Sequence, residues 1–127
     1  MAPYRILVVD DSELVHELAR MALSDAEAGW EVRCVASGAE ALAATVTTAP
    51  DAVLLDVEMP DMDGPATVAA LRAQPTTAQT PILFLTGHED PAERARLTAL
   101  EVAGVLSKPF AVTELADQVA GALGWTR

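Results

Sequence analysis

Four apolar runs of strand length in this sequence are each followed by polar side chains that could carry out chemistry. The polar groups are the acid pair Asp10-Asp11, the acid Asp56, the hydroxyl of Thr86 and the ammonium of Lys108. Ligands of open parallel α/β sheets bind in the crevice outside the carboxyl ends of the strands, so such a sheet would gather these groups into one pocket. Crowded carboxylates repel one another, and they either share protons or hold a hard cation such as Mg2+. An ammonium and a hydroxyl beside them suit phosphoryl oxygens, and the set predicts metal-assisted phosphoryl chemistry.

The elements that must position these groups alternate between strand and helix patterns along the whole chain. The candidate strands are nearly continuous in apolar residues, which is typical of strands buried on both faces of a parallel sheet. They are Arg5–Val9, Glu31–Ala36, Ala52–Leu55, Ile82–Leu85 and Gly104–Ser107. Helical patterns follow them at Glu13–Ala28, Ala39–Thr48, Ala66–Ala73, Pro91–Glu101 and Val112–Leu123. The alternation predicts an α/β fold of the (βα)5 type, with a doubly wound five-stranded parallel sheet.

Local signals refine this pattern. In the first helix, residues at three- and four-residue spacing form one apolar stripe, made of Leu14, Leu18, Met21 and Ala22. Gly29 stands where a helix stop is expected. Gln74–Thr80 is the loosest stretch of the chain, and we expect it to have no role beyond linking.

Length and composition limit what else the chain can be. Its 127 residues suit one domain with a single core, and a hydrophobic content of 51% argues against disorder. With 19 acidic and 8 basic residues the net charge is −11, which disfavours direct binding to nucleic acid or to anionic membranes, because both depend on basic patches. No apolar run approaches the roughly 18 residues of a membrane helix, so the cytoplasm is the default location. The lone Cys34 lies inside a strand pattern and is expected to pack rather than to act in redox chemistry.

Each polar group also has a plainer explanation when taken alone. Asp10-Asp11 could cap the following helix, and Thr86 is of a residue type common in strands. Asp56, however, ends an otherwise apolar run, and a second strand-end acid in a neighbouring βα unit strengthens the functional interpretation. Lys108 is followed by Pro109, which adds a constrained turn in which a cis bond would be a deliberate feature.

Four segments together carry a resemblance to a known family. They are Val8-Val9-Asp10-Asp11-Ser12, Leu54–Gly64 (LLDVEMPDMDG), Pro81–Gly87 (PILFLTG) and Lys108-Pro109-Phe110. In this order and spacing the chain closely resembles the receiver domain of two-component response regulators. The resemblance implies a flavodoxin-like strand order 2-1-3-4-5. It also implies that residues 1–127 form a single receiver domain without an effector domain.

The resemblance further implies a role for each matched residue. Asp56 corresponds to the phosphoacceptor, whose carboxylate becomes an acyl phosphate. Asp11 and Asp56 correspond to direct Mg2+ ligands, joined by the backbone carbonyl of Glu58, and Asp10 to an acid that holds the metal through water. Thr86 and Lys108 correspond to the groups that contact the incoming phosphoryl oxygens.

The sequence departs from the family pattern at one position. Receivers commonly carry Tyr or Phe three residues before the Lys, and here that position is Val105, which we interpret as a core strand residue. The usual route that relays phosphorylation through the Thr and this ring is therefore in doubt. Glu58 and His88 correspond to positions that tune the lifetime of the acyl phosphate, although both could be solvated loop side chains. His16 has no evident partner, and we expect it on the surface.

The leading hypothesis is a phosphoacceptor switch. It would take its phosphoryl group from a sensor histidine kinase or a histidine phosphotransfer protein and act on a downstream protein by direct contact. Such a module is not an enzyme in the usual sense, because it catalyses only its own phosphorylation and dephosphorylation. Whether it is a stand-alone regulator or a receiver cut from a longer protein stays open.

Two other functions also stay open. Small phosphatases of the haloacid dehalogenase type use a strand-end Asp, an acid two residues later (here Glu58), a Thr and a Lys, but the pair Asp10-Asp11 fits the receiver better. The other alternative is a receiver-like scaffold that is never phosphorylated, against which the complete set of acids, Thr and Lys argues.

Overall fold

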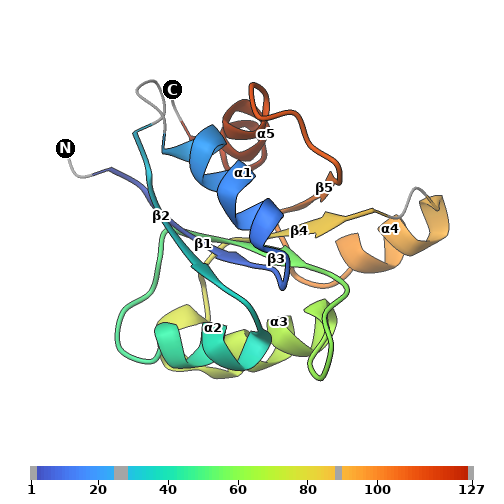
Figure 1. The fold of residues 1–127 in the computed structure, drawn as a ribbon. Coiled ribbons are helices and arrows are strands. Elements are labelled where there is room, and N and C mark those ends of the chain that lie inside the picture. The colour runs from blue at the N-terminus through green and yellow to red at the C-terminus, as the bar shows by residue number, and fades with distance from the viewer. Residues whose placement is uncertain (1–2, 25–28, 88–89, 126–127) are drawn as a thin grey trace.

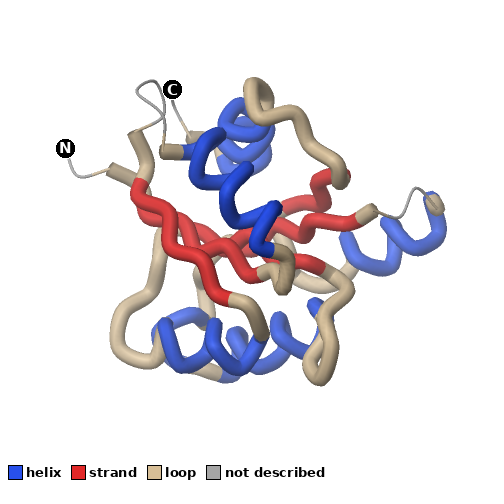
Figure 2. The backbone as a smooth tube through the Cα atoms, in the orientation of Figure 1, coloured by secondary structure: helices blue, strands red, loops and turns tan. Residues whose placement is uncertain are grey.

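The computed structural model describes residues 3–24, 29–87 and 90–125 and has three layers, with a parallel sheet between two layers of helices (Figures 1 and 2). The five strands lie in the order β2-β1-β3-β4-β5, which confirms the predicted α/β architecture and strand order. Helices α1 and α5 cover one face of the sheet, and α2 and α3 cover the other, on which α4 also lies. Among the described residues, no helix combines the length and the apolar character that crossing a membrane requires.

The strands and helices have the following bounds. The strands are β1 Arg5–Val9, β2 Glu31–Val35, β3 Ala52–Asp56, β4 Ile82–Thr86 and β5 Gly104–Ser107. The helices are α1 Glu13–Leu23, α2 Gly38–Ala44, α3 Gly64–Ala73, α4 Pro91–Thr98 and α5 Leu115–Leu123, with a short 3-10 helix at Pro75–Thr77. All five strands occur where the sequence predicts them, and β3 and β4 run one residue further than predicted, so that Asp56 and Thr86 are their last residues.

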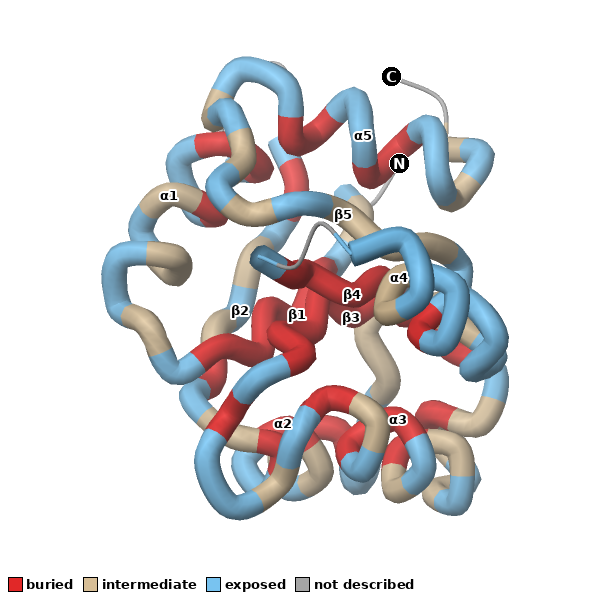
Figure 3. Tube along the Cα trace, turned by 90° about the vertical axis from the view of Figure 1, so that its right-hand side faces the viewer, coloured by how far each residue is buried: buried red, intermediate tan, exposed pale blue. Residues whose placement is uncertain are grey.

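The core consists of two apolar layers, one on each face of the sheet. β3 and β4 are buried at every position, whereas the edge strands β2 and β5 are partly exposed. In Figure 3 the buried strands β1, β3 and β4 lie between helices whose outer sides are exposed. The layer beneath α1 and α5 includes Leu54 and Leu83, and the layer beneath α2, α3 and α4 includes Leu55 and Phe84. Cys34 packs against the first of these layers, in agreement with its predicted role.

The predicted apolar stripe of the first helix is wrong in part. Leu14 and Met21 are 63% and 61% exposed, whereas Ala22 of the predicted stripe is buried and forms the inner face of α1 together with Ala19 and Leu23. The helix is apolar around much of its circumference, and packing against α5 and β2 decides which side faces inward. It also ends at Leu23, before the predicted end at Ala28, so Gly29 is not its stop residue, although Gly29 does have a positive φ of 64°.

The connection Gln74–Thr80 is more than a linker, contrary to the sequence-based expectation. Thr77 is fully buried in the short 3-10 helix, and Arg72 donates to the carbonyl oxygens of Thr77 and Thr80 at 3.0 and 2.7 Å. The side chains of Gln74 and Thr76 reach across to Thr45, at 2.9 Å from Nε2 to Oγ1 and 2.5 Å from Oγ1 to the carbonyl oxygen. These bonds fix the end of α2 against the end of α3.

Candidate functional site

The carboxyl ends of the central strands meet at a cavity lined by polar groups. Its volume is about 400 Å³, and it is lined by Asp56, Glu58, Thr86, Gly87 and Lys108. Asp56 and Thr86 come from the last positions of the adjacent strands β3 and β4, and both are buried. Lys108 follows β5, where its backbone N–H donates to the carbonyl oxygen of Thr86 at 2.8 Å. The structure therefore brings the predicted acid, hydroxyl and ammonium to one place.

The acid pair at the end of β1 joins the same site. Carboxylate oxygens of Asp10, Asp11 and Asp56 lie within 4.8 Å of one another. Asp10 is fully buried, whereas Asp11 is exposed. The helix cap that the pair could have supplied is instead Ser12, whose Oγ accepts from the N–H of Val15 at 3.3 Å. Helix capping therefore does not explain the presence of Asp10 and Asp11.

Lys108 is the cation that pairs with two of the three carboxylates. Its Nζ lies 2.6 Å from Oδ2 of Asp10 and 3.2 Å from Oδ1 of Asp56. Oδ2 of Asp10 is fully enclosed, and the ammonium of Lys108 is its partner. One ammonium facing three carboxylates leaves the site short of positive charge.

The surroundings shift two pKa values in the site. Burial raises the pKa of Asp56, and the charge of Asp10 raises it further, while Lys108 and the N–H of Glu58 oppose the rise. For Lys108, burial alone would lower the pKa, but contact with Asp10 and the charges of Asp10 and Asp56 outweigh burial and raise it. Lys108 therefore keeps its proton at neutral pH. Keeping Asp56 ionised costs free energy because of its burial and the charge of Asp10, and a bound cation would lower that cost.

This donor set fits a hard divalent cation. Mg2+ prefers carboxylate and carbonyl oxygens and keeps several waters, so a few protein oxygens with access to solvent suffice. The three clustered carboxylates supply such oxygens, the exposed Asp11 leaves one side open to water, and a single ammonium pairs with two of the carboxylates. Glu58 lies at the rim, where its backbone N–H donates to Oδ1 of Asp56 at 3.3 Å and its side chain is exposed.

The loop between β3 and α3 is held tightly beneath Asp56. The N–H of Gly64 donates to the carbonyl oxygen of Val57 at 2.8 Å. A Cβ at Gly64 would lie 2.8 Å from Cα of Val57 and 3.0 Å from the carbonyl oxygen of Asp56, which no side chain could accept without movement of the backbone. Asp61 in the same loop has a positive φ of 68°, a conformation that Asp tolerates better than most residues. The bond from Lys108 to Pro109 is cis.

His16 is a residue whose position the sequence did not reveal. We expected it on the surface without a partner, but it is half-buried, and its Nε2 lies 2.6 Å from the carbonyl oxygen of Asp10 and 3.2 Å from that of Val35. Both partners are acceptors, so Nε2 carries the proton that is donated. His16 thereby ties the end of β1 to the end of β2 directly behind the acid pair. The spacing of residues in the sequence does not predict this contact, because the contact depends on how α1 is rotated about its axis against the sheet.

Two further predicted positions have different outcomes. Val105 on β5 is partly buried against the apolar layer beneath α4, as expected of a core strand residue. The guanidinium of Arg94 on α4 donates to its carbonyl oxygen at 2.9 Å. His88 lies outside the described residues.

Comparisons with known proteins agree with this fold and show the family of the chain. A family model of the response regulator receiver domain matches residues 6–120. The response regulator MprA of Mycobacterium sp. (strain KMS) is 42% identical over 113 residues, which are 89% of this chain and 47% of that protein. A protein-glutamate methylesterase/protein-glutamine glutaminase of Anaeromyxobacter dehalogenans is 40% identical over 116 residues, which are 91% of this chain and 33% of that protein. The chain thus spans from a third to about half of the length of these curated relatives.

Solved structures show the same likeness. Chemotaxis protein CheY4 of Vibrio cholerae superposes with a TM-score of 0.86 at 35% identity, covering 95% of this chain and 99% of that chain. The receiver domain of a sensor histidine kinase of Pseudomonas aeruginosa, solved with a magnesium ion in its active site cleft, gives 0.79 at 28% identity, covering 97% and 99%. The phosphorylated cyanobacterial phytochrome response regulator RcpA gives 0.79 at 26% identity, covering 94% and 91%.

Proposed function

The chain belongs to the receiver domains of response regulators, and from that premise we propose that Asp56 is its phosphoacceptor, with Thr86 and Lys108 contacting the phosphoryl oxygens. Members of this family are phosphoacceptor switches of two-component signalling. The observation that carries the assignment is the cavity of about 400 Å³ that Asp56 shares with Thr86 and Lys108. The family match makes a receiver the function that this geometry supports best, ahead of a phosphatase or an unphosphorylated scaffold.

The contacts of Asp56 support a choice between its two oxygens as the one that attacks. Oδ1 accepts from the N–H of Glu58 and lies 3.2 Å from Nζ of Lys108, so it is already engaged. Oδ2 is the nucleophile: it forms the new bond to phosphorus while the bond from phosphorus to the donor breaks. For a phosphohistidine donor, the electron pair of that bond returns to the imidazole nitrogen, and the ring leaves neutral if its other nitrogen carries a proton. The product is an aspartyl phosphate at the end of β3.

The other residues neutralise charge and position the phosphoryl group. Lys108 keeps its proton because its pKa is raised, and its ammonium can follow the phosphoryl oxygens as they arrive. Thr86 offers a hydroxyl from the neighbouring strand end. Asp10, Asp11, Asp56 and the carbonyl oxygen of Glu58 would hold Mg2+, directly or through water, and the ion would lower the repulsion between the acidic site and an anionic donor.

The same proposal includes partners and location. The donor is a sensor histidine kinase or a histidine phosphotransfer protein, and the exposed side chains of Leu14 and Met21 on α1 supply apolar contact area on the helix that follows Asp11. The output is contact with a downstream protein, without direct binding to nucleic acid or membrane, in keeping with the net charge of −11. The protein acts in the cytoplasm and catalyses only its own phosphorylation and dephosphorylation.

Phosphorylation by a small donor tests the assignment. Incubation with acetyl phosphate and Mg2+ is expected to add one phosphate that base and hydroxylamine remove, as they remove acyl phosphates. Asp56→Asn abolishes the modification, because an amide is not a nucleophile. Asp61→Asn is the matched control, since this exposed acid lies in the same loop and Asn also tolerates its positive φ. A phosphate that persists in Asp56→Asn, or that resists base, places the acceptor elsewhere.

A further inference from the structure

The basic residues of this acidic chain are few, and most of those described are already committed to interactions. Lys108 lies in the phosphoacceptor site, Arg96 pairs with Glu93, and Arg72 and Arg94 donate to backbone oxygens. Arg33 has no hydrogen bond or ion pair with any described residue, and the guanidinium of Arg5 makes one contact, at 3.3 Å to the carbonyl oxygen of Ala49. Both line one groove at the amino end of the sheet, far along β1 from Asp10.

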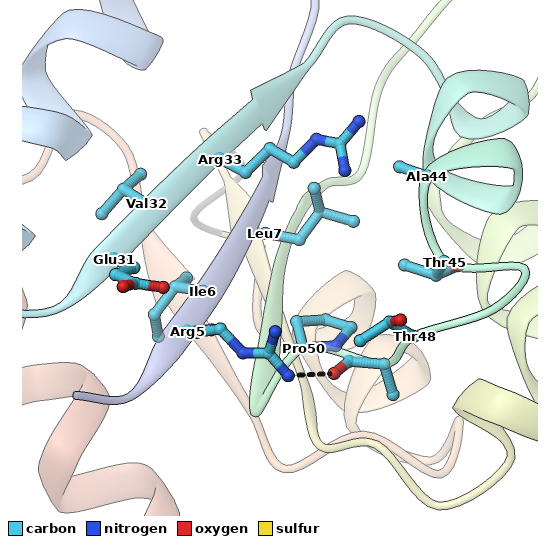
Figure 4. Close-up of a pocket in the computed structure, with 11 residues that line it drawn as sticks. Arg5, Ile6, Leu7, Glu31, Val32, Arg33, Ala44, Thr45, Thr48 and Pro50 are labelled. Carbon is cyan, nitrogen blue, oxygen red and sulfur yellow. Dashed lines mark hydrogen bonds between the residues drawn. The ribbon is translucent and has the colours of Figure 1, made fainter. Parts of the chain in front are cut away.

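The groove lies between the strands β1 and β2 and the segment that leads from α2 to β3. Its volume is about 420 Å³, within the range of pockets that bind small molecules. Leu7 pairs with Arg33 across the two strands, and Arg5 is two residues from Leu7, so both arginines project from the same face of the sheet. In Figure 4 both guanidinium groups extend toward residues 44–50, with Leu7 between them.

The groove is preformed. α2 ends at Ala44, one turn short of its predicted end, so residues 45–50 run past the sheet as irregular chain and leave its face open there. This segment is fixed by the bonds from Gln74 and Thr76 to Thr45. The wall of the groove is therefore ordered before a ligand binds, and binding does not carry the entropic cost of ordering it.

We propose that this groove, defined by Arg5, Arg33 and residues 44–50, binds a small organic anion that carries carboxylate or phosphate groups. A guanidinium presents a planar fork of donors that matches both groups, and most donors of Arg5 and all donors of Arg33 are free for it among the described residues. Thr48 adds a hydroxyl to the lining, and Leu7, Ala44 and Pro50 supply apolar contact to the carbon skeleton. Glu31 also lines the groove, opposite Arg5 in the register of β1 and β2, so one carboxylate offsets part of the charge of the two guanidinium groups and leaves an excess of one positive charge among these three side chains.

Amide chemical shifts measured at constant ionic strength without Mg2+ test the proposal. Citrate and glycerol 2-phosphate are the probes for the two kinds of anionic group, and chloride is the reference. Saturable shifts are expected in β1, in β2 and in residues 44–50, with one of the two probes binding more tightly and so identifying the group preferred. Arg33→Ala is expected to weaken binding about tenfold, the usual result of losing one charge-assisted contact, and Arg33→Lys to restore part of it.

The matched control is Arg20→Ala, which removes the same charge from an exposed position on α1 outside the groove. Its affinity for the probes should equal that of the unaltered protein. Equal affinity in Arg33→Ala, or shifts confined to the surroundings of Lys108, would overturn the proposal. So would a response to an acidic peptide without a response to either small anion, because the surface would then be a protein contact. Acetyl phosphate labelling of Asp56 in Arg33→Ala stays at its normal level, which separates this groove from the phosphoacceptor site.

Discussion

The two ends of the sheet are built from different interactions. At the amino end, Tyr4 stacks on Trp125 with ring centroids 3.7 Å apart and planes 6° from parallel, and Trp30 meets both rings edge-on at 6.1 and 5.2 Å. At the carboxyl end, three carboxylates cluster together, and one ammonium pairs with two of them. The first arrangement gains stability from every contact, whereas the second retains repulsion and burial of charge.

The difference shows that this fold tolerates unfavourable electrostatic interactions at the carboxyl end of the sheet. The aromatic cluster of Tyr4, Trp30 and Trp125 joins the starts of β1 and β2 to the end of α5, so it closes the core around the first and last elements. That packing offsets the electrostatic cost at the other end, which is the end that does chemistry. Substitutions at the amino end should therefore change stability without changing the site, whereas substitutions at the carboxyl end should change the site and have smaller effects on stability.

The largest effect is expected at the aromatic end. Trp30→Ala removes a ring that is 6% exposed and contacts two others, and it should lower the free energy of unfolding by about 3 kcal/mol, as loss of a buried large aromatic does. Denaturant unfolding measures this loss. Mg2+ affinity, measured where the variant is still folded, should not change. Trp30→Phe keeps an aromatic ring and should lose much less; a change in Mg2+ affinity in either variant would show that the two ends are coupled.

A smaller effect is expected behind the acid pair. His16→Leu removes the donor that holds the carbonyl oxygens of Asp10 and Val35, and Mg2+ affinity should fall about tenfold, at the low end of the effect of residues that support metal ligands. His16→Gln offers an amide donor and should recover part of the affinity. Titration of Mg2+ by amide shifts measures both. Equal loss in the two variants would mean that His16 contributes packing and not a hydrogen bond.

The electrostatic cost at Asp56 gives a third, smaller effect. A carboxyl group whose pKa is raised in the folded state stabilises the fold below its unfolded pKa, and that contribution is lost as the pH rises through the folded pKa. Without Mg2+, Asp56→Asn should therefore be more stable than the unaltered protein at neutral pH, by a free energy on the order of 1 kcal/mol, the usual size of single substitutions.

Lowering the pH through the raised pKa of Asp56 should bring the two stabilities together, because the unaltered side chain then becomes neutral too. Saturating Mg2+ should reverse the order at neutral pH, since the ion binds the folded carboxylate and not the amide. Thermal unfolding across pH measures these differences. A gain from Asp56→Asn that is the same at every pH would have a cause other than charge.

The sequence predicted the strands and the strand-end groups because these depend on local composition and on one rule of sheet topology. Asp56 and Thr86 follow buried apolar runs, and any parallel sheet in this order brings such positions together. The position of His16 could not be predicted, because α1 offers more than one apolar side and its rotation is set by α5 and β2. The bonds of Thr45 to residues 74 and 76 were missed for a similar reason, since they join chain segments about thirty residues apart.

The smallest expected effect is a conformational change in α4 when the phosphoacceptor site is occupied. Beryllofluoride, a phosphoryl mimic, should draw Thr86 and Lys108 toward Asp56, because both can donate to its fluorine atoms as they would to phosphoryl oxygens. α4 follows β4, and its attachment is slight: Leu97 is its one fully enclosed side chain, and Arg94 donates to the carbonyl oxygen of Val105 and, at 3.3 Å, to Oγ of Ser107. Amide shifts should therefore appear in Gly87 and in α4 even though Val105 replaces the usual ring.

The aromatic cluster at the amino end of the sheet should not respond in the same experiment. Both tryptophans lie in the cluster at the amino end, so their emission should not change when beryllofluoride binds, whereas the amides of α4 move. Val105→Tyr, which restores the ring, tells whether an aromatic side chain enlarges the movement of α4 or leaves it as it is. If amide shifts are confined to residues that touch the ligand, the domain accepts phosphate without switching. If the tryptophan emission changes, the two ends of the sheet share one conformational equilibrium, and differential contacts at the site bias the whole fold rather than the α4 side alone.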